Sequence, residues 1–451
     1  MDISQLRNRN VTVIGAARSG VAVAALLQDE GARVFVSDKG EAEKLRAEAQ
    51  VLSQAGIAWE LGEHTDRAYD CSLMVLSPGV PSNAPVVTEA QKRGIKIVSE
   101  VEVASWYCRS PIVAVTGSNG KTTTTTLIGR ILGDAKKKHA VAGNIGTAFS
   151  SLVLGLAETD FAVLEISSFQ LDHCETFRPR ISIILNVTQN HMDRYENSMG
   201  KYASAKARIF MNQADDDVLI YDADDPWTAK IVQAARCRTI PFSLQGSLSE
   251  GAYVQDGWLM TSLDAKETEI IKTDQISIRG PHNLYNAMAS TLTGRLLGVG
   301  TASIRATLKN FKGVEHRQEL VREVNGVRYY NDSKATSVDA VWYALQAFDQ
   351  PIVLMLGGRD KGNDYARIFD LVRKRVRAIV AMGESADKVE KAFSGFMNVR
   401  RANSIDEAVL TAQSVAQPGD VVLLSPACAS FDWFENYEQR GKVFKELVKN
   451  L

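Results

Sequence analysis

The sequence TGSNGKTT at residues 116–123 follows an apolar run, Ile112–Val115, and opens a stretch with a helical pattern. A strand, a glycine-rich turn and a helix in this order are typical of a phosphate-binding loop. The glycines let backbone N–H groups turn toward an anion, and the start of the helix adds a partial positive charge. We predict that Lys121 reaches the β- and γ-phosphates of a nucleotide and that the Thr122 hydroxyl is a ligand of Mg²⁺.

The loop is a variant of the general P-loop pattern. That pattern has a glycine six residues before the lysine, and Val115 stands at this position. A glycine-rich turn with one lysine can also be purely structural, but the strand before it and the helix after it favour nucleotide binding. We therefore expect a phosphate-binding loop of variant form.

The composition is that of an ordinary globular protein. Its 451 residues predict about three domains, each with its own core. Charged residues make up 23% and the net charge is −1, so we expect no nucleic-acid partner. The first residues lack the apolar core of a signal peptide, and no run approaches the roughly 18 apolar residues of a membrane span. We therefore expect no membrane partner and a cytoplasmic location.

Five scattered cysteines without a Cys-x-x-Cys pair indicate neither a disulfide framework nor a zinc site.

Short apolar runs alternate with helical patterns along the chain, which is typical of parallel sheets covered by helices. We predict an α/β protein of three domains: a Rossmann-like parallel sheet in residues 1–108, a P-loop ATPase-like sheet in 109–311 and a Rossmann-like sheet in 312–451. Alternating segments between about residues 240 and 280 predict a small antiparallel addition to the central sheet. The expected strands are 11–14, 33–37, 73–76, 161–165, 181–185, 217–221, 352–356, 378–382 and 421–424.

The first expected strand runs into the turn GAARSG at residues 15–20, and Asp38 ends the second strand. A dinucleotide-binding fold keeps a ribose-binding acid at about this position. However, Ala17 replaces the middle glycine of the dinucleotide fingerprint and crowds the approach of a pyrophosphate. A nucleotide site and a tight turn without a ligand both remain open.

Several polar residues follow the strands of the central domain. Glu165 ends one strand beside the phosphate loop, where a metal ligand is expected, although a surface acid fits the same pattern. His191 follows the next strand and could equally be a structural histidine. By local pattern alone, Lys206 is a solvated helix lysine and Asn144 a turn residue.

The TGSNGKTT loop resembles the ATP loop of the Mur ligases and of their folylpolyglutamate synthase relatives, and the resemblance extends over nearly all of the chain. It implies an ATP-dependent ligase of peptidoglycan synthesis that joins D-glutamate to UDP-N-acetylmuramoyl-L-alanine through an acyl phosphate. The D-N-P-[KR] signature of diaminopimelate- and lysine-adding relatives is absent from the sequence. The matching motifs are NVTQNHMDR at 186–194 and, for the D-glutamate-adding branch, NDSKAT at 331–336, GGRDKG at 357–362 and SPACASFD at 425–432.

The resemblance implies that ATP and two Mg²⁺ ions are the cofactors. In the family, the lysine that matches Lys206 is carbamylated by CO₂, which converts an ammonium into an oxygen ligand that suits Mg²⁺. The implied catalytic residues are Lys121, Glu165, His191 and Lys206, and the implied metal ligands are Thr122, Glu165, His191 and Lys206. The implied ATP-binding residues are Gly117, Ser118, Asn119, Gly120, Lys121, Thr122, Thr123, Asn286, Arg317 and Asp332.

The resemblance also implies the residues that hold the two other substrates. Lysines and hydroxyls suit the two carboxylates of D-glutamate. Tyr437 stands where the family has phenylalanine. The residues implied for the UDP-substrate are Arg18, Ser19, Asp38, Lys39, Ser77, Gly79, Asn144 and His191, and those implied for D-glutamate are Lys334, Thr336, Lys361, Ser430 and Tyr437.

Three other functions compete with this interpretation. A folylpolyglutamate synthase shares the central loop and the ligase chemistry, but the motifs of the third domain favour the muramoyl branch. A dehydrogenase would depend on the turn at residues 15–20, and a non-catalytic P-loop module would bind nucleotide without turnover. We expect a monomer.

Overall fold

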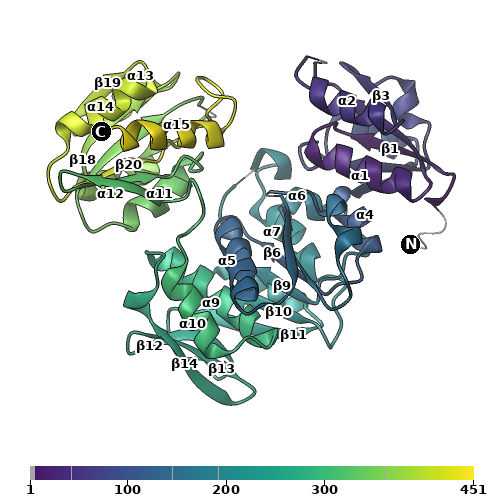
Figure 1. The fold of residues 1–451 in the computed structure, drawn as a ribbon, viewed down its shortest axis with the longest axis horizontal. Coiled ribbons are helices and arrows are strands. Elements are labelled where there is room, and N and C mark those ends of the chain that lie inside the picture. Colours follow the sequence, from purple (N-terminus) through teal and green to yellow (C-terminus); the bar gives the residue numbers. More distant parts are fainter. Residues whose placement is uncertain (1–5, 42, 145, 191, 361) are drawn as a thin grey trace. The chain divides into compact units, whose positions relative to one another are not determined.

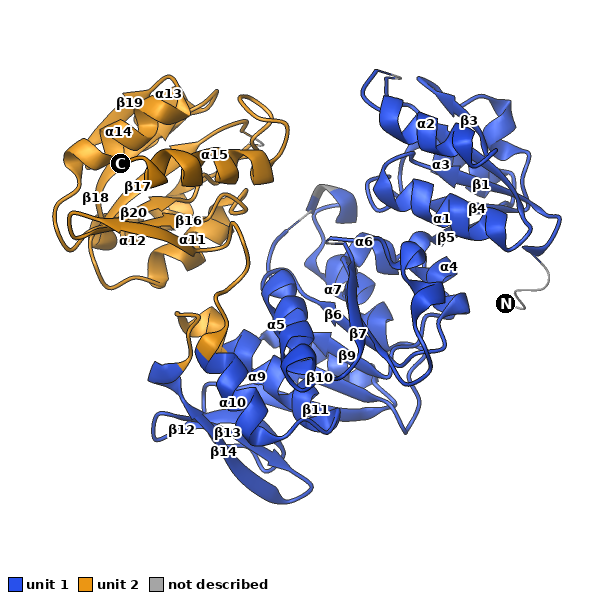
Figure 2. Cartoon of the chain, viewed as in Figure 1, with its two compact units in different colours: residues 1–275, 285–309 blue, residues 276–284, 310–451 orange. Residues whose placement is uncertain are grey.

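The computed structural model describes residues 6–41, 43–144, 146–190, 192–360 and 362–451, without the side chain of Asp193. Two predicted site residues, His191 and Lys361, therefore lie outside the described residues. The chain divides into two compact units (Figure 2), residues 1–275 with 285–309 and residues 276–284 with 310–451. The first unit holds two sheets and the second holds one. The domain limits at 108/109 and 311/312 stay predictions.

The N-terminal sheet has five parallel strands in the order β3-β2-β1-β4-β5. Alternate residues of its strands enter two cores: Val11 and Val13 of β1 pack into one, and Ile14 packs into the other. Both faces of the sheet are therefore covered, as a buried parallel sheet requires. The elements are β1 (Asn10–Ile14), α1 (Arg18–Asp29), β2 (Arg33–Asp38), α2 (Arg46–Gln54), β3 (Ala58–Leu61), β4 (Leu73–Leu76), α3 (Pro85–Lys92), β5 (Lys96–Ser99) and α4 (Glu100–Tyr107).

The central sheet has nine strands in the order β14-β13-β12-β11-β10-β9-β6-β8-β7. The predicted antiparallel addition is confirmed: β12 pairs antiparallel with β13, and β13 with β14. The elements (Figure 1) are β6 (Ile112–Thr116), α5 (Lys121–Asp134), β7 (His139–Gly143), β8 (Phe161–Glu165), α6 (Ser168–Leu171), β9 (Ile181–Ile184), α7 (Met199–Ala207), β10 (Val218–Asp222), α8 (Pro226–Ile231), β11 (Arg238–Ser243), β12 (Gly251–Gln255), β13 (Trp258–Leu263), β14 (Lys266–Lys272), α9 (Pro281–Leu296) and α10 (Thr301–Asn310).

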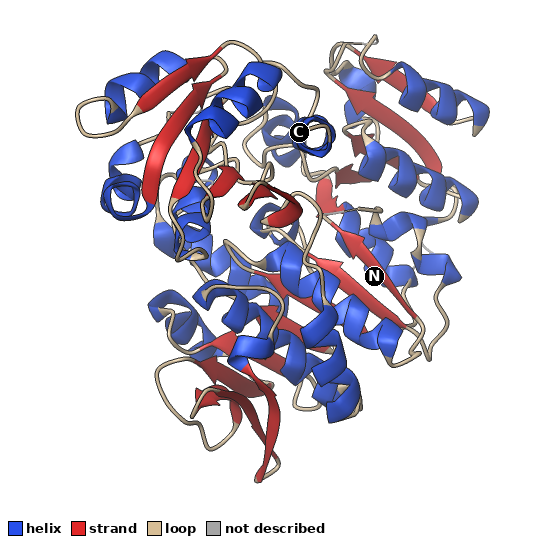
Figure 3. Cartoon of the chain, turned by 60° about the vertical axis from the view of Figure 1, so that its left-hand side comes forward, coloured by secondary structure: helices blue, strands red, loops and turns tan. Residues whose placement is uncertain are grey.

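The third sheet has six strands in the order β15-β16-β20-β17-β18-β19, and only β15 is antiparallel to its neighbour. Helices lie along the sheets in each unit (Figure 3), and the predicted α/β fold class is confirmed. The elements are β15 (Glu319–Val324), β16 (Val327–Asn331), α11 (Val338–Gln346), β17 (Ile352–Gly357), α12 (Phe369–Arg375), β18 (Val376–Met382), α13 (Ala386–Phe393), β19 (Val399–Ala402), α14 (Ile405–Val415), β20 (Val421–Leu424) and α15 (Tyr437–Lys449).

Two buried carboxylates of α4 join the N-terminal and central sheets of the first unit. Glu102 accepts hydrogen bonds from the backbone N–H of Thr176 at 2.8 Å and of Phe177 at 2.9 Å. Glu100 accepts from the backbone and the hydroxyl of Ser150, and burial raises the pKa of this carboxyl. Because buried carboxylates need such donors, these bonds fix α4 to the central domain.

No helix of the described residues is both long enough and apolar enough to cross a membrane.

Candidate active site

The phosphate loop lies between β6 and α5, as predicted. Gly117 and Gly120 have φ values of +153° and +84°, which L side chains rarely adopt. A Cβ atom on Gly120 would overlap the Oδ1 atom of Asn286, which lies on α9. Only glycine therefore fits at position 120, and the predicted ATP residue Asn286 lies against the loop. Asn286 Oδ1 also accepts a hydrogen bond from the hydroxyl of Thr124 at 3.2 Å. Thr124 directly follows the predicted ATP residue Thr123.

The segment after β9 fixes the shape of this loop. Asn119 donates its backbone N–H to Asn186 Oδ1 at 2.8 Å. Ser118 donates its backbone N–H to the carbonyl of Asn186 at 2.9 Å. The Ser118 hydroxyl also donates to the carbonyl of Thr188 and accepts from its N–H, at 2.8 and 2.9 Å. These bonds tie the backbone of the loop and the Ser118 side chain to the segment after β9.

Lys121 begins α5 and turns back over the loop. Its ammonium donates to the carbonyl oxygens of Gly117 and Ser118, at 2.8 and 3.0 Å. The lysine charge is thus held at the start of a helix, where phosphate oxygens are also favoured.

Glu165, at the carboxyl end of β8, contacts two other predicted site residues, Thr122 and Asn144. It is 2% exposed. One carboxylate oxygen accepts from the Thr122 hydroxyl at 2.7 Å, and the other accepts from Asn144 Nδ2 at 3.1 Å. A hydroxyl and a carboxylate side by side are the hard oxygen donors that Mg²⁺ prefers, so these residues fit the predicted metal ion.

Lys206 of α7 is 1% exposed, so its assignment to a solvated helix face by local pattern was wrong. Its amine donates to the carbonyl of Gly117 at 2.9 Å and lies 4.5 Å from the ring centre of Tyr202. Burial, and next the charge of Lys121, lower the pKa of this amine well below its usual value. A buried lysine amine whose charged form is disfavoured therefore lies beside the phosphate loop.

The turn at residues 15–20 is held from inside the N-terminal sheet. Asp38 accepts from the backbone N–H of Ala16 at 2.6 Å and from that of Gly40 at 2.7 Å. Ser77 is buried and donates to the carbonyl of Gly15 at 2.8 Å. Two of the predicted UDP-substrate residues thus shape the turn itself. The others on this sheet are half-buried (Ser19) or exposed (Arg18, Lys39 and Gly79).

In the second unit, Asp332 lies directly after β16 and is buried. It accepts from the Ser425 hydroxyl at 2.8 Å. Burial raises the pKa of Asp332 to about 7, and the nearby charge of Arg317 opposes this rise. The two residues predicted to contact ATP from this unit are thus electrostatically coupled.

The predicted D-glutamate residues that the structure describes lie in two segments of the same unit. β16 and β20 are parallel neighbours, so the segments that follow them leave the same edge of the sheet. Lys334 lies with its ammonium 5.3 Å from the ring centre of Tyr437. Thr336 is half-buried, and Ser430, after β20, is 2% exposed.

Family models match three consecutive parts of the chain: "MurD N-terminal domain" at residues 10–86, "Mur ligase middle domain" at 115–294 and "Mur ligase, glutamate ligase domain" at 316–428. A curated protein of Salinibacter ruber named UDP-N-acetylmuramoylalanine--D-glutamate ligase is 46% identical over 461 residues, with 100% of both chains covered. The chain belongs to the Mur ligase family.

Solved Mur ligase structures share the fold. The UDP-N-acetylmuramate-alanine ligase of Thermotoga maritima aligns with a TM-score of 0.61 at 19% identity, covering 98% of this chain and 100% of that one. E. coli FolC, solved in complex with DHPP and ADP, aligns with a TM-score of 0.59 at 15% identity, covering 78% of this chain and 92% of that one. At these identities the likeness concerns the fold alone.

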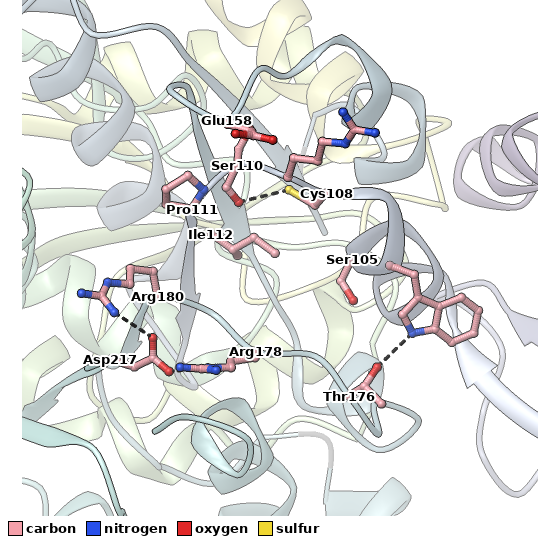
Figure 4. A pocket seen from close by; sticks show the side chains of 12 residues that line it. Ser105, Cys108, Ser110, Pro111, Ile112, Glu158, Thr176, Arg178, Arg180 and Asp217 are labelled. Carbon is pink, nitrogen blue, oxygen red and sulfur yellow. Dashed lines mark hydrogen bonds and ion pairs between the residues drawn. The ribbon is translucent and has the colours of Figure 1, made fainter. Parts of the chain in front are cut away.

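This Mur ligase has a cavity of about 390 Å³ (Figure 4). It lies at the end of the central strands opposite to the phosphate loop. Ile112 lines it at the amino end of β6, whereas the phosphate loop follows the carboxyl end. Arg178 and Arg180 line it too, and both are paired with Asp217. The cavity contains none of the predicted site residues, so it is separate from the candidate active site.

Glu315, His316 and Glu319 of this Mur ligase lie close enough together to resemble a metal cluster. However, the ammonium of Lys445 contacts Glu315 at 2.6 Å and Glu319 at 2.9 Å. The lysine occupies the position that a cation would take. This cluster shares no residue with the predicted metal ligands.

Sequence reasoning missed several residues that shape the site of this Mur ligase. Asn186 and Thr188 lie inside the NVTQNHMDR motif, so the motif itself could have indicated them. Tyr202 precedes Lys206 by one helical turn and bonds to Ser118, with their hydroxyl oxygens 3.1 Å apart. Arg440 of α15 is a further buried residue that local pattern did not indicate.

Proposed function

We propose that this Mur ligase joins D-glutamate to UDP-N-acetylmuramoyl-L-alanine at the expense of ATP, in peptidoglycan synthesis. The observation that carries the proposal is the phosphate loop, with Lys121 above it and the Thr122–Glu165 pair at its end. The full-length relative named for this reaction supports the choice of substrates.

The reaction has two steps. The carboxylate of UDP-N-acetylmuramoyl-L-alanine attacks the γ-phosphorus of ATP, the bond to the β-phosphate oxygen breaks, and ADP leaves. The amine of D-glutamate then attacks the carbonyl carbon of the acyl phosphate, loses a proton and expels inorganic phosphate. No protein nucleophile takes part, so the residues supply position and charge.

Within this chemistry, Lys121 would stabilise the negative charge on the transferring phosphoryl group. Thr122 and Glu165 would hold Mg²⁺, joined by His191 and by a carbamate on Lys206 at a second ion. When bound, Mg²⁺ neutralises charge on the phosphates and orients them. The burial of Lys206 supports the carbamate, because a lowered pKa favours the free amine, which is the form that reacts with CO₂.

The remaining site residues are proposed by family resemblance. Arginine suits a γ-phosphate because its fork matches two oxygens, and aspartate suits ribose hydroxyls. We assign these roles to Arg317 and Asp332, with Gly117, Ser118, Asn119, Gly120, Thr123 and Asn286 completing the ATP site. We assign Arg18, Ser19, Asp38, Lys39, Ser77, Gly79, Asn144 and His191 to the UDP-substrate, and Lys334, Thr336, Lys361, Ser430 and Tyr437 to D-glutamate.

A phosphate-release assay tests the proposal. The purified chain, ATP and Mg²⁺ are combined with UDP-N-acetylmuramoyl-L-alanine and with D-glutamate, L-glutamate, D-aspartate, lysine or diaminopimelate in turn. We expect sustained phosphate release only with D-glutamate, and none when the UDP-substrate is omitted. Release with a folate acceptor and L-glutamate instead would favour the folylpolyglutamate synthase alternative. ATP binding without any turnover would favour the alternative of a non-catalytic P-loop module.

We also propose a monomer in the cytoplasm, where ATP is available. Size-exclusion chromatography with light scattering tests the monomer: a mass near 49.4 kDa is expected, and twice that mass would contradict it.

A further inference from the structure

Arg440, on α15, has one of the largest fully buried side chains among the described residues. Only 2% of this residue is exposed. An arginine on an amphipathic surface helix usually keeps its charged head in water. Burial lowers the pKa of Arg440 to about 10, so the guanidinium still carries its charge at neutral pH.

All the hydrogen-bond acceptors around Arg440 in the described residues are uncharged oxygen atoms. Nη2 donates to the carbonyls of Ser333 and Cys428, at 2.8 and 3.1 Å. Nε donates to the Ser333 hydroxyl at 2.9 Å, and Nη1 to the carbonyl of Ala429 at 3.4 Å. These bonds satisfy the planar fork. No carboxylate of the described residues pairs with it directly, although the charge of Asp432 acts on it through space.

These acceptors belong to the two segments that carry predicted D-glutamate residues. Ser333 directly precedes Lys334, and Ala429 directly precedes Ser430. Arg440 therefore ties the segment after β16 to the segment after β20. The second segment needs such support, because Ala427 has a φ of +58°, in the left-handed region that non-glycine residues rarely adopt.

The third motif of the unit, GGRDKG, also packs against this arrangement. The backbones of Arg359 and Ala429 exchange two hydrogen bonds, at 2.9 and 3.2 Å. A Cβ atom on Gly358 would overlap the carbonyl of Ala429 and lie 3.2 Å from Nη1 of Arg440. The guanidinium thus lies where three loops meet that are distant in sequence.

We propose that Arg440 is a positioning residue for the amino-acid substrate. Its fork sets the spacing of Lys334 and Thr336 relative to Ser430, and its charge adds positive potential that favours a dicarboxylate. Arg440 does not itself touch the substrate. The inference rests on the proposed function of these residues in holding D-glutamate.

The test compares Arg440→Lys, which keeps a charge but loses the fork, with Arg377→Lys. Arg377 is the matched control, because it makes two hydrogen bonds to Asp420 before β20, at the opposite edge of the same sheet. KM values for D-glutamate, ATP and the UDP-substrate, kcat, and melting temperature are measured for the full chain and both variants.

We expect Arg440→Lys to raise the KM for D-glutamate by about tenfold, as the loss of one or two hydrogen bonds predicts. The other two KM values should stay within about twofold, and Arg377→Lys should leave all three unchanged. Ser333→Ala removes the hydroxyl that accepts from Nε and that donates to the carbonyl of Tyr437 at 2.8 Å. It should raise the KM for D-glutamate by a smaller factor and serves where Arg440→Lys does not fold.

If Arg440→Lys folds, an unchanged KM for D-glutamate would overturn the inference. If it does not fold, an unchanged KM for D-glutamate in Ser333→Ala would overturn it. An equal rise in all three KM values would also overturn it, because that result indicates a general structural role. No D-glutamate-dependent phosphate release by the unaltered chain would overturn the proposed function, and the inference with it.

Discussion

Lys121 and Lys206 donate to the same acceptor, the carbonyl oxygen of Gly117, at 2.8 and 2.9 Å. Two amines this close cannot both carry a charge at low cost in a buried site. Because Lys206 is the buried one, its pKa is lowered, and Lys121 lowers it further. The phosphate-loop lysine thereby disfavours the charged form of the helix lysine.

The first prediction concerns Lys121→Ala. The variant should lose phosphate release by at least about a hundredfold, because one cation opposite the phosphates stabilises charge in the transition state. The fold should remain intact, since Lys121 is half-buried and its ammonium donates to loop carbonyls rather than packing in a hydrophobic core. The measurement is turnover together with a melting curve. Lys201→Ala, which breaks an exposed ion pair with Glu196, is the control, and near-normal turnover in Lys121→Ala would show that the loop assignment is wrong.

The second prediction concerns pH and Asp332. Burial raises the pKa of its carboxyl to about 7, so the folded state favours the protonated form. This favourable contribution is complete below the ordinary carboxyl pKa and is lost as the pH rises toward and through 7. Asp332→Asn should therefore gain stability over the parent at pH 8 but not at pH 4. Melting curves from pH 4 to 8 measure the difference.

The exposed Asp349, paired with Arg375, provides the control for Asp332→Asn. Asp349→Asn should follow the parent at every pH. A constant difference between Asp332→Asn and the parent from pH 4 to 8 would mean that Asp332 titrates in the ordinary range.

The third prediction concerns the link between the two sheets of the first unit. Glu102→Gln replaces a carboxylate oxygen by an NH₂ group opposite backbone N–H donors. We expect the free energy of unfolding to fall by about 2 kcal/mol, measured by urea unfolding. Glu89 of α3 forms an exposed ion pair with Arg93, and Glu89→Gln should change the free energy of unfolding by less than about 1 kcal/mol. Equal urea midpoints for Glu102→Gln and the parent protein would show that Glu102 does not anchor α4 to the central domain.

The sequence predicted the sheets and the phosphate loop because both depend on local patterns. Strands such as Phe161–Glu165 are continuous apolar runs, and the loop is defined by glycine spacing. Several strands were missed, among them β3, β15 and β19, because most of their residues are exposed or half-buried. The hydrophobic pattern of such strands is too weak to mark them in the sequence.

Partners across the sheet could not be predicted from such patterns. Asn186 reaches the phosphate loop because β9 is the neighbour of β6, an order that no local feature gives. Arg440 follows the same logic: an arginine side chain predicts a solvent-exposed position, and only the meeting of three loops provides acceptors for it where it is buried. Lys206 was identified by family resemblance, whereas its local pattern predicted the wrong environment.

The last prediction concerns Lys206 itself. If a carbamate on this lysine holds a metal ion, Lys206→Ala should nearly abolish turnover, because an oxygen ligand is lost. The truncation also leaves space in a buried site, next to the carbonyl of Gly117. A short carboxylate such as acetate or formate should occupy that space and restore part of the turnover. Lys206→Arg should not be rescued, because its side chain fills the space and keeps its charge.

The measurement is turnover of both variants across a series of carboxylates of increasing size, with chloride at equal ionic strength as the control. Rescue should decline as the carboxylate outgrows the vacated volume, whereas a general salt effect would not depend on size. Wild-type activity should also fall after CO₂ depletion and recover when bicarbonate is added. Full activity of Lys206→Ala without any added carboxylate would mean that the buried amine has a structural role, holding the Gly117 carbonyl, and no part in metal binding.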